Sequence, residues 1–521
     1  MNAKEVVILD KGALYAFYDL QMSPVTFDFF QFLILADLDR RARGLGKLHV
    51  VIIPEATDIR KKFVLDRFDE VDMNWRIRQI LVPGCSLMPS CGGLVTVCGS
   101  RTEAANFFLM AGLNVFPEGS SIENSIPRFQ LSEITAVHVC GETWSSLKAT
   151  SQAVDMVRSW IKSRANGRRV ISITLREAGY GNEKNSNIAE WARFAHSLDA
   201  DKYLPVVIRD TYAVNEMVPE ELDGLTFFNE IAVNIELRMA FYEECYLNLM
   251  TNGGPLALCI LNHNVRCLSF KPMVKSWHDS TARGLQAAVG VAVGDQPHFQ
   301  NSFQRWVWAD DNYEVIQKYF DMMVAFIDNP GSHTKNGEAI GFFAINREPA
   351  LKVGERFDKF KTFNSAAIVL RHCLQFDSKN LALRLRVAVN ETWIKNFSAA
   401  DRNFDIILKA EPENSYARLC YADFLAVQSK IDQAIASYRY GILLDPKKIT
   451  GYLRLGLVLG KIGLIDDALY VVRQAILINP GDAGSYRLCA RFLREKGDDQ
   501  ESEIMVEKAN ELDPEVFEDH L

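Results

Sequence analysis

The chain has 521 residues, which is too long for one hydrophobic core and allows three or four domains. With 48% hydrophobic and 24% charged residues, its composition is that of an ordinary soluble protein. The net charge of −8 argues against a general nucleic-acid binder, because phosphate contacts require clustered Lys and Arg.

Cysteine usage and targeting signals both favour a cytoplasmic protein. The ten cysteines are scattered without a CxxC pair, which indicates reduced, mostly buried thiols rather than a disulfide framework. We find no signal peptide after Met1, and the most apolar helix, near Phe27–Leu38, is too short to span a bilayer. We therefore expect a cytoplasmic location and no transmembrane segment.

Residues 1–165 are predicted to form one α/β domain. Apolar runs predict strands at Glu5–Leu9 and Leu48–Ile53, separated by a loop and a helix that starts at Ser23-Pro24. The first turn lacks the G-x-G-x-x-G pattern, so a dinucleotide site has little support. The later predicted elements are strands at Gln79–Val82, Leu94–Cys98 and Leu113–Phe116 and helices at Ser100–Met110 and Ser145–Ala165.

Residues 166–330 are predicted to form a second α/β domain that begins with the stretch Val170–Asp210. A buried strand at Val170–Leu175 is followed by a polar loop, an amphipathic helix from Ile188 and a second strand at Leu204–Ile208. Polar residues thus gather at the carboxyl ends of strands, where open parallel sheets bind ligands. The later predicted elements are a strand at Leu225–Phe228, a helix at Asn229–Leu249, strands at Leu256–Leu261 and Val265–Phe270, and a helix ending at Met322–Phe326.

Candidate catalytic residues lie at this edge. Arg176 leaves the end of a buried strand and would present a fixed fork of donors suited to a diphosphate. Glu177 could act as a base or hold Arg176, and Asp210 follows the neighbouring strand. Asn185 and Ser186 precede a helix and would supply N-cap and amide groups that favour anions. The alternative is that Arg176 pairs with Glu177 or Asp210 in a purely structural role.

The turn Asn252-Gly253-Gly254-Pro255 is a second candidate binding segment. Glycines let the backbone approach a ligand closely and leave amides free to donate. The alternative is a turn without function, because Gly-Gly-Pro is strong turn chemistry. His263, His278 and His298 are too far apart in sequence to indicate a metal site, and His298 near Asp295 is a weaker candidate for a general base.

The C-terminal third contains an internal repeat. Its prolines and the small residues before them recur every 34 residues: Pro412, Pro446, Pro480 and Pro514; Ala388, Ala422, Gly456 and Ala490; and Ala400, Ala434, Ala468 and Ser502. Small residues let two helices approach closely, and proline ends the second helix. This pattern resembles the tetratricopeptide repeat. We expect a linker at residues 331–346 and an α-helical repeat domain at 347–521.

The segment Ile173–Glu177, a strand that ends in arginine with an acidic neighbour, is similar to a motif of fucosyltransferase-like enzymes of the GT-B fold. The resemblance implies two Rossmann-like lobes, with residues 1–165 on the acceptor side and 166–330 on the nucleotide-sugar side. It implies that Arg176 contacts the nucleotide diphosphate. GT-B members generally need no bound metal, so no cofactor is expected beyond a nucleotide sugar as co-substrate.

The leading hypothesis is a metal-independent glycosyltransferase that moves a sugar from a nucleotide sugar to a protein or glycan acceptor. In this hypothesis Asn252, Gly253, Gly254 and Pro255 bind the donor, and the repeats recruit the acceptor or a protein partner. The alternative is a non-catalytic repeat scaffold fused to an inactive α/β domain. A third possibility is a hydrolase or epimerase that acts on nucleotide sugars.

Overall fold

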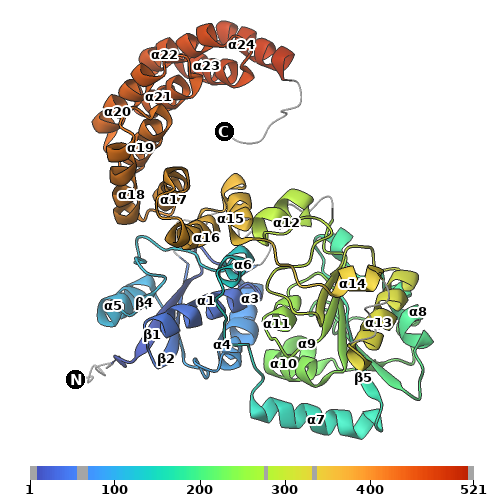
Figure 1. The fold of residues 1–521 in the computed structure, drawn as a ribbon. Helices are drawn as coiled ribbons and strands as arrows, with labels where there is room; N and C mark the ends of the chain where they lie inside the picture. The colour runs from blue at the N-terminus through green and yellow to red at the C-terminus, as the bar shows by residue number, and fades with distance from the viewer. Residues whose placement is uncertain (1–8, 56–68, 275–279, 331–336, 514–521) are drawn as a thin grey trace. The chain divides into compact units, whose positions relative to one another are not determined.

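The computed structural model describes residues 9–55, 69–274, 280–330 and 337–513 (Figure 1). The chain divides into two compact units, Met1–Ser365 and Ala366–Leu521. The first combines parallel sheets with helices, and the second is helical throughout its described residues. An α/β part followed by an all-α part is therefore confirmed, as is the parallel character of the sheets.

The first sheet has the strand order β3-β2-β1-β4, and all its described pairings are parallel. Its strands are β1 (Ala13–Asp19), β2 (Lys47–Ile53), β3 (Val95–Val97) and β4 (Val115–Phe116). Its helices are α1 (Phe29–Ala42), α3 (Glu70–Arg76), η1 (Ile77–Leu81), α4 (Val82–Gly84), η2 (Cys85–Leu87), α5 (Arg101–Ala111) and α6 (Leu131–Val139).

Two elements of this region differ from the sequence-based prediction. Ala13–Asp19 is a central strand where a loop was expected, and all of its residues are buried because it lies between β2 and β4. The expected strand Glu5–Leu9 lies outside the described residues except for Leu9, which is not in a strand. The expected strand Gln79–Val82 is helical, with Ile80 and Leu81 buried on one side and Arg78 exposed on the other.

The second sheet has the order β10-β9-β8-β5-β6-β7, again with parallel pairings. The order reverses between β5 and β8, as in a doubly wound Rossmann sheet. Its strands are β5 (Arg169–Thr174), β6 (Tyr203–Ile208), β7 (Thr226–Phe227), β8 (Leu247–Thr251), β9 (Cys267–Phe270) and β10 (Gln304–Val307).

Further helices of the first unit lie between Ser151 and Lys359. They are α7 (Ser151–Ala165), η3 (Asn182–Lys184), α8 (Ile188–Ser197), η4 (Glu220–Leu222), α9 (Glu230–Val233), α10 (Ile235–Glu244), α11 (Leu256–Ile260), α12 (Ala282–Ala288), α13 (Tyr313–Asp328), α14 (Gly337–Phe343) and α15 (Ala350–Lys359). Within the expected linker 331–346, α14 is ordered, and Phe343 stacks on Phe326 with 4.1 Å between ring centroids.

Two apolar runs of the second sheet region were assigned to the wrong structure. Leu247–Thr251 is the central strand β8, although Leu247–Leu249 was predicted to end a helix. Leu256–Ile260 is the helix α11, although a strand was predicted. Every residue in both runs is buried, so neither shows the periodicity that separates a helix from a strand.

The two sheets share one hydrophobic core. The largest buried cluster takes residues from both, among them Ala16 of β1, Val206 of β6 and Leu258 of α11. The opposite faces are covered separately, by α5 on the first sheet and by α8 and α13 on the second. Each sheet is therefore covered on both faces, as parallel sheets require.

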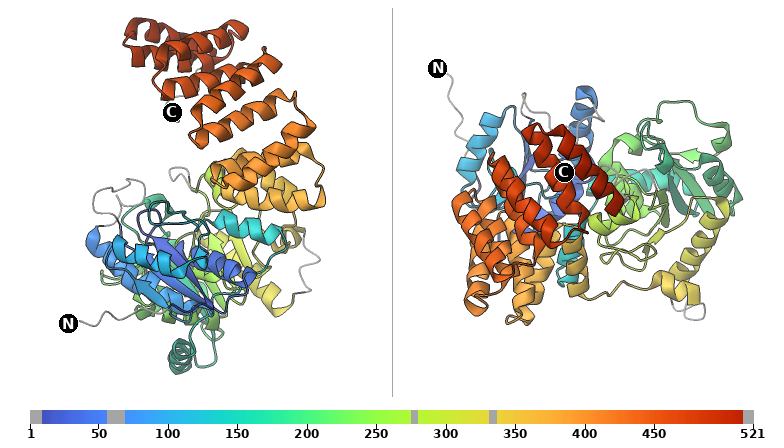
Figure 2. Two further views of the ribbon diagram at one scale, coloured as in Figure 1. Left: turned by 90° about the vertical axis from the view of Figure 1, so that its left-hand side faces the viewer. Right: turned by 90° about the horizontal axis from the view of Figure 1, so that it is seen from above.

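The second unit repeats one helix pair at a fixed interval (Figures 1 and 2). The first helices are α17 (Leu381–Trp393), α19 (Ser415–Val427), α21 (Ile449–Lys461) and α23 (Ala483–Lys496), and the second helices are α18 (Phe397–Ala410), α20 (Ile431–Leu444), α22 (Ile465–Ile478) and α24 (Asp499–Leu512). Both series start at 34-residue intervals. The helix α16 (Phe363–Phe376) keeps the same frame one repeat earlier.

The small residues of the repeat lie where the paired helices touch. Ala400, Ala434 and Ala468 are completely buried. At Gly456, an added β-carbon would lie 2.7 Å from Cγ2 of Val472 on the partner helix. The tetratricopeptide-like architecture expected from the spacing is therefore confirmed. Pro514, the last proline of the series, lies outside the described residues.

Candidate functional site

The two candidate segments of the second sheet lie side by side at its carboxyl edge. Arg176 follows β5 and Asn252–Pro255 follows β8, the two strands between which the order reverses. A β-carbon added to Gly253 would lie 3.7 Å from Cδ of Arg176. The hydroxyls of Ser186 and Thr251 are 3.1 Å apart and join the two loops. Rossmann-like sheets bind ligands at this position.

Arg176 holds its own loop together. Its guanidinium donates to the carbonyl oxygens of Gly181 and Tyr180 at 3.0 and 2.9 Å, and also to Oδ1 of Asn185. Its backbone N–H donates to Oγ of Ser186 at 2.9 Å. Burial lowers the pKa of Arg176, and the nearby side chains of Tyr180 and Asp210 oppose that shift. The guanidinium is half-buried, and these three acceptors all belong to the loop that follows it.

Glu177 pairs with Arg209, not with Arg176. Oε1 of Glu177 lies 2.5 Å from Nη2 of Arg209, and the two side chains are only 10% and 4% exposed. Nε of Arg209 donates to both carboxylate oxygens, at 3.1 and 3.0 Å. Asp210 accepts from the backbone N–H of Glu177 at 3.3 Å. The carboxyl ends of β5 and β6 are thus held together by a buried ion pair that the sequence did not reveal.

The side chain of Asp311 binds the N-terminus of α8, a role that the sequence analysis did not assign to it. Oδ2 of Asp311 accepts from the backbone N–H of Asn187 and from Nε1 of Trp191, both at 2.8 Å. The N-cap role expected of Asn185 and Ser186 therefore belongs to a carboxylate from the segment after β10. A carboxylate suits this place because a helix N-terminus attracts negative charge.

Lys271 completes this edge of the sheet. It follows β9, and its backbone has φ +56°, a left-handed conformation that residues other than glycine rarely adopt. Its Nζ lies 3.5 Å from Oδ1 of Asp311 and 3.4 Å from the carbonyl oxygen of Asn185. Its position directly after a predicted strand, next to Pro272, is the signal that could have identified it.

The turn Asn252–Pro255 also contacts the first sheet region. A β-carbon on Gly254 would lie 2.7 Å from Cδ2 of Phe27, so the aromatic ring occupies the space that glycine leaves open. Nδ2 of Asn252 donates to the carbonyl oxygen of Pro272 at 3.3 Å. Pro255 is the N-cap residue of α11. In this structure, Gly254 therefore serves close packing.

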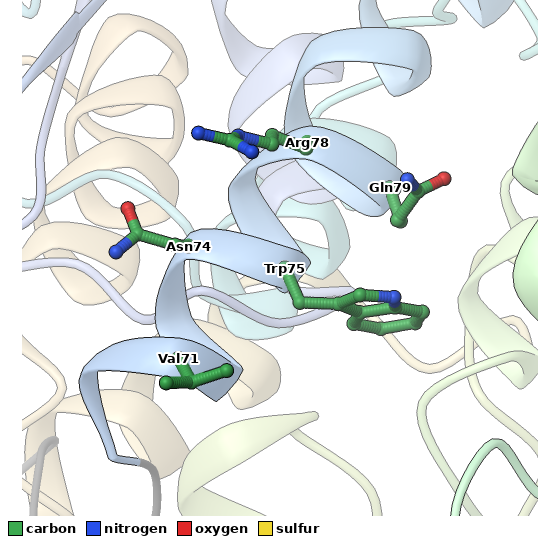
Figure 3. Close-up of a pocket in the computed structure, with 5 residues that line it drawn as sticks. All are labelled: Val71, Asn74, Trp75, Arg78 and Gln79. Atoms are coloured by element: carbon green, nitrogen blue, oxygen red, sulfur yellow. The ribbon is translucent and has the colours of Figure 1, made fainter.

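A surface hollow of about 460 Å³ lies on the helix formed by α3 and η1 (Figure 3). Figure 3 shows the side chains that line it, which are Val71, Asn74, Trp75, Arg78 and Gln79. Arg76 of the same helix influences the pKa of Tyr180, a residue of the loop after β5. Burial raises the pKa of Tyr180, and the nearby positive charges of Arg76 and Arg176 oppose that rise. The hollow thus shares a helix with Arg76, whose charge acts to lower the pKa of Tyr180 in the Arg176 loop.

Two histidines that are distant in sequence lie against Trp144. The rings of His263 and His138 are 4.8 and 5.9 Å from that of Trp144, and Phe299, next to His298, is 6.3 Å away. Burial lowers the pKa of His298 to about 4, and its Nε2 lies 3.5 Å from Oε2 of Glu348, so its acidic neighbour is Glu348 rather than Asp295. His278 lies outside the described residues. Within the described part of the chain, no group of His, Cys, Asp and Glu is arranged to hold a metal ion.

Two further expectations concern thiols and membranes. Within the described residues no disulfide joins the ten cysteines, and eight of the thiols are buried, which agrees with the expectation of mostly buried thiols. Among the helices in the described ranges, none combines the length and apolar character needed to cross a membrane.

Comparisons with known proteins relate the chain only to solved structures. No family model matches it, and no curated protein matches it. It is similar to MamA, with 20% identity over 31% of this chain and 94% of the MamA chain, at a TM-score of 0.26. A MamA from Desulfovibrio magneticus RS-1 shows 14% identity over 32% of this chain and 93% of its own, at a TM-score of 0.27. A thermophilic tetratricopeptide-repeat protein from Thermus thermophilus shows 15% identity over 32% and 91%, at 0.29.

Proposed function

We propose that the first unit is a glycosyltransferase that binds a nucleotide sugar at the point where the second sheet reverses its strand order. The single observation that carries the proposal is the position of Arg176 beside Gly253 at the adjacent carboxyl ends of β5 and β8. Ligands of doubly wound sheets bind there because the loops diverge and leave a crevice. A cation at that point suits the diphosphate of a nucleotide sugar.

In this proposal, Arg176 stabilises the charge that develops on the leaving diphosphate. Charge stabilisation of this kind is usually the largest contribution of an active site. The guanidinium N–H groups of Arg176 donate to the carbonyl oxygens of Tyr180 and Gly181. When the nucleotide sugar binds, phosphate oxygens would replace these neutral carbonyl oxygens as hydrogen-bond partners. Asn252 and Gly253 would contact the nucleotide. Glu177 would hold Arg209 and Asp210 in place, and would not act as a base, because its carboxylate is already paired.

The acceptor would be a protein or a glycan, and the repeats would recruit it or a protein partner. Arrays of helix pairs expose long continuous surfaces, and protein binding is their common use. The reaction proposed here uses a nucleotide sugar as co-substrate and no bound metal.

Titration calorimetry with UDP-, GDP- and CMP-sugars tests the proposal. We expect one class of donor to bind the full chain and Arg176→Ala to abolish that binding. The matched control is Arg193→Ala, which removes an exposed arginine of α8 whose ion pair with Glu314 lies on the surface. If the wild-type protein binds none of the donors, the proposal fails.

A second candidate function, a non-catalytic scaffold, is favoured by two specific contacts. The carboxylate of Asp311 accepts a hydrogen bond from the backbone N–H of Asn187 at the start of α8, and the ring of Phe27 fills the space beside Gly254. Both are places that an anionic ligand would use. A scaffold predicts that capture of a protein partner depends on residues 366–521 and is unchanged by Arg176→Ala. Sugar release or sugar transfer that depends on Arg176 would exclude it.

A further inference from the structure

A second cation lies on the other side of the turn that follows β8. Arg176 follows β5, Gly253 follows β8 and Lys271 follows β9, and the sheet contains these strands in the order β9-β8-β5. The described atom nearest to a β-carbon built on Gly253 is Cδ of Arg176, at an ordinary contact distance of 3.7 Å. The two cations therefore flank a residue that has no side chain.

Asn185 contacts both cations. Its Oδ1 accepts a hydrogen bond from Nη1 of Arg176, and its carbonyl oxygen lies 3.4 Å from Nζ of Lys271. One residue thus holds the guanidinium and the ammonium group near each other. Because two positive charges that are brought together repel each other, an anion that lies between them would be stabilised by both.

The ammonium group of Lys271 has only long contacts in this structure. Its Nζ lies 3.5 Å from Oδ1 of Asp311, whereas charged N–H groups usually approach carboxylate oxygens to about 2.7–2.9 Å. Oδ2 of Asp311 already accepts two hydrogen bonds, both at 2.8 Å, from the backbone of Asn187 and the indole of Trp191. Asp311 therefore has partners of its own, and Lys271 can exchange its long contacts for shorter ones to a phosphate.

The backbone of Lys271 also points to a role in binding. Its φ of +56° lies in the left-handed region, where a residue with a β-carbon is strained and glycine is not. Residues in such conformations cluster at ligand sites, because the strain is retained only where the side chain is needed. A lysine in this conformation at the carboxyl end of a strand is therefore a candidate ligand-binding residue.

We propose that Lys271 is a second phosphate-binding residue and that it makes the site specific for a diphosphate. Arg176 binds one phosphate group and Lys271 the other, with the backbone of Gly253 between them. A single phosphate group satisfies only one of the two cations, so it binds less tightly. For the donor, this inference rests on the proposed function: the donors are nucleoside diphosphate sugars, and CMP-sugars, which carry one phosphate, are excluded.

Titration calorimetry of the full chain with inorganic pyrophosphate and with inorganic phosphate tests the site without a nucleotide. We expect pyrophosphate to bind at least roughly tenfold more tightly, and Lys271→Met to remove most of this preference. Lys202→Met is the matched control, because Lys202 is exposed at the amino end of β6 in the same sheet. A wild type without the preference, an unaffected Lys271→Met variant or a Lys202→Met variant that loses the preference overturns the proposal.

Variants of Asp311 separate binding by Lys271 from a purely structural role. Lys271→Met leaves a buried carboxylate without its cation, so the double variant with Asp311→Asn keeps the test valid if the single variant unfolds. We expect the double variant to unfold near the wild-type temperature and still to lack the preference for pyrophosphate. Asp311→Asn alone removes the anion that competes for Lys271, and it should bind pyrophosphate roughly two- to fivefold more tightly. A double variant that keeps the preference, or an Asp311→Asn variant that binds no more tightly than wild type, assigns Lys271 a structural role and overturns the proposal.

Nucleotide sugars distinguish this proposal from the glycosyltransferase proposal. Binding of UDP- or GDP-sugars without binding of CMP-sugars supports both. A CMP-sugar that binds as tightly as the diphosphate sugars overturns the diphosphate specificity and leaves the glycosyltransferase proposal standing. A wild type that prefers pyrophosphate through Lys271 but binds no nucleotide sugar supports the diphosphate site and ends the glycosyltransferase proposal.

Discussion

The ring of Phe27 lies against Gly254, where a β-carbon on that glycine would be 2.7 Å from Cδ2 of the ring. The two residues come from the regions of different sheets, and Phe27 packs against the core that both sheets share. The absence of a side chain at position 254 is therefore a condition for this contact.

The first prediction is that Gly254→Ala destabilises the first unit. The added methyl group must displace an aromatic ring in a packed region, which costs about 1–3 kcal/mol. The same substitution should cost less in a Phe27→Ala background, because the clash is gone. Urea unfolding in a Trp393→Phe background measures both, since the remaining tryptophans belong to the first unit. Additive effects of Gly254→Ala and Phe27→Ala would show that the two positions are not coupled.

The second prediction concerns the buried pair of Glu177 and Arg209. Glu177→Gln leaves a nearly buried guanidinium without its counter-charge, and we expect a loss of about 3 kcal/mol in unfolding free energy. Glu177→Gln combined with Arg209→Met should recover much of that loss, because no unpaired charge remains. Thermal unfolding of the wild-type protein and the two variants measures these differences. A stable single variant that loses only activity would instead indicate a catalytic role for Glu177.

The third prediction is a loss of stability in acid that depends on His298. Burial lowers the pKa of His298 from 6.5 in the unfolded chain to about 4 in the folded one, with Glu348 opposing and Arg356 and His138 reinforcing the shift. Between these values the unfolded state binds more protons, so stability is greatest above pH 6.5 and falls as the pH drops toward 4. Burial also lowers the pKa of His138 and of His263. These two histidines therefore also make the protein less stable as the pH falls.

Urea unfolding at pH 7.5 and pH 5 measures this dependence. His298 should account for roughly 2 kcal/mol of the difference between the two pH values. His298→Gln cannot titrate, so the variant should show a correspondingly smaller difference. An unchanged difference would assign the acid sensitivity to other groups.

The fourth prediction concerns the helix pairs of the second unit. Gly456→Ala places a methyl group 2.7 Å from Cγ2 of Val472, so either that side chain or the paired helices α21 and α22 must shift. We expect a cost of about 1–3 kcal/mol in the stability of the repeats. Gly481→Ala is the control, because its nearest neighbour is Oδ1 of Asn479 at 3.5 Å. Circular dichroism during unfolding follows the repeats, and equal stability of both variants would contradict the prediction.

The sequence alone determined the repeats almost completely. Each helix pair contacts mainly its neighbours in the chain, so the information that specifies it is local and recurs with the period. The positions of Ala400, Ala434 and Ala468 indicated their burial because only small residues fit between paired helices. The strand before Arg176 was predictable from its run of β-branched and apolar residues, and the helix from Ile188 from the helical spacing of its apolar side chains.

Only the tertiary structure decided the elements that are buried on every side. Every residue of Ala13–Asp19, Leu247–Thr251 and Leu256–Ile260 is buried, polar ones such as Asn248 included, so these segments have no exposed polar face from which their conformation could be assigned. Their conformation depends on which strands flank them and which helices cover them.

The partners of the charged residues at the carboxyl edge were also beyond sequence reasoning. Glu177 pairs with Arg209, which lies 32 residues further along the chain. Asp311 accepts a hydrogen bond from Asn187 at the start of α8, 124 residues earlier in the chain. Such pairs follow from the strand order, which a single sequence does not reveal. Local periodicity thus specified the repeats and the individual β-α units, whereas the order of the strands determined which of their polar ends meet.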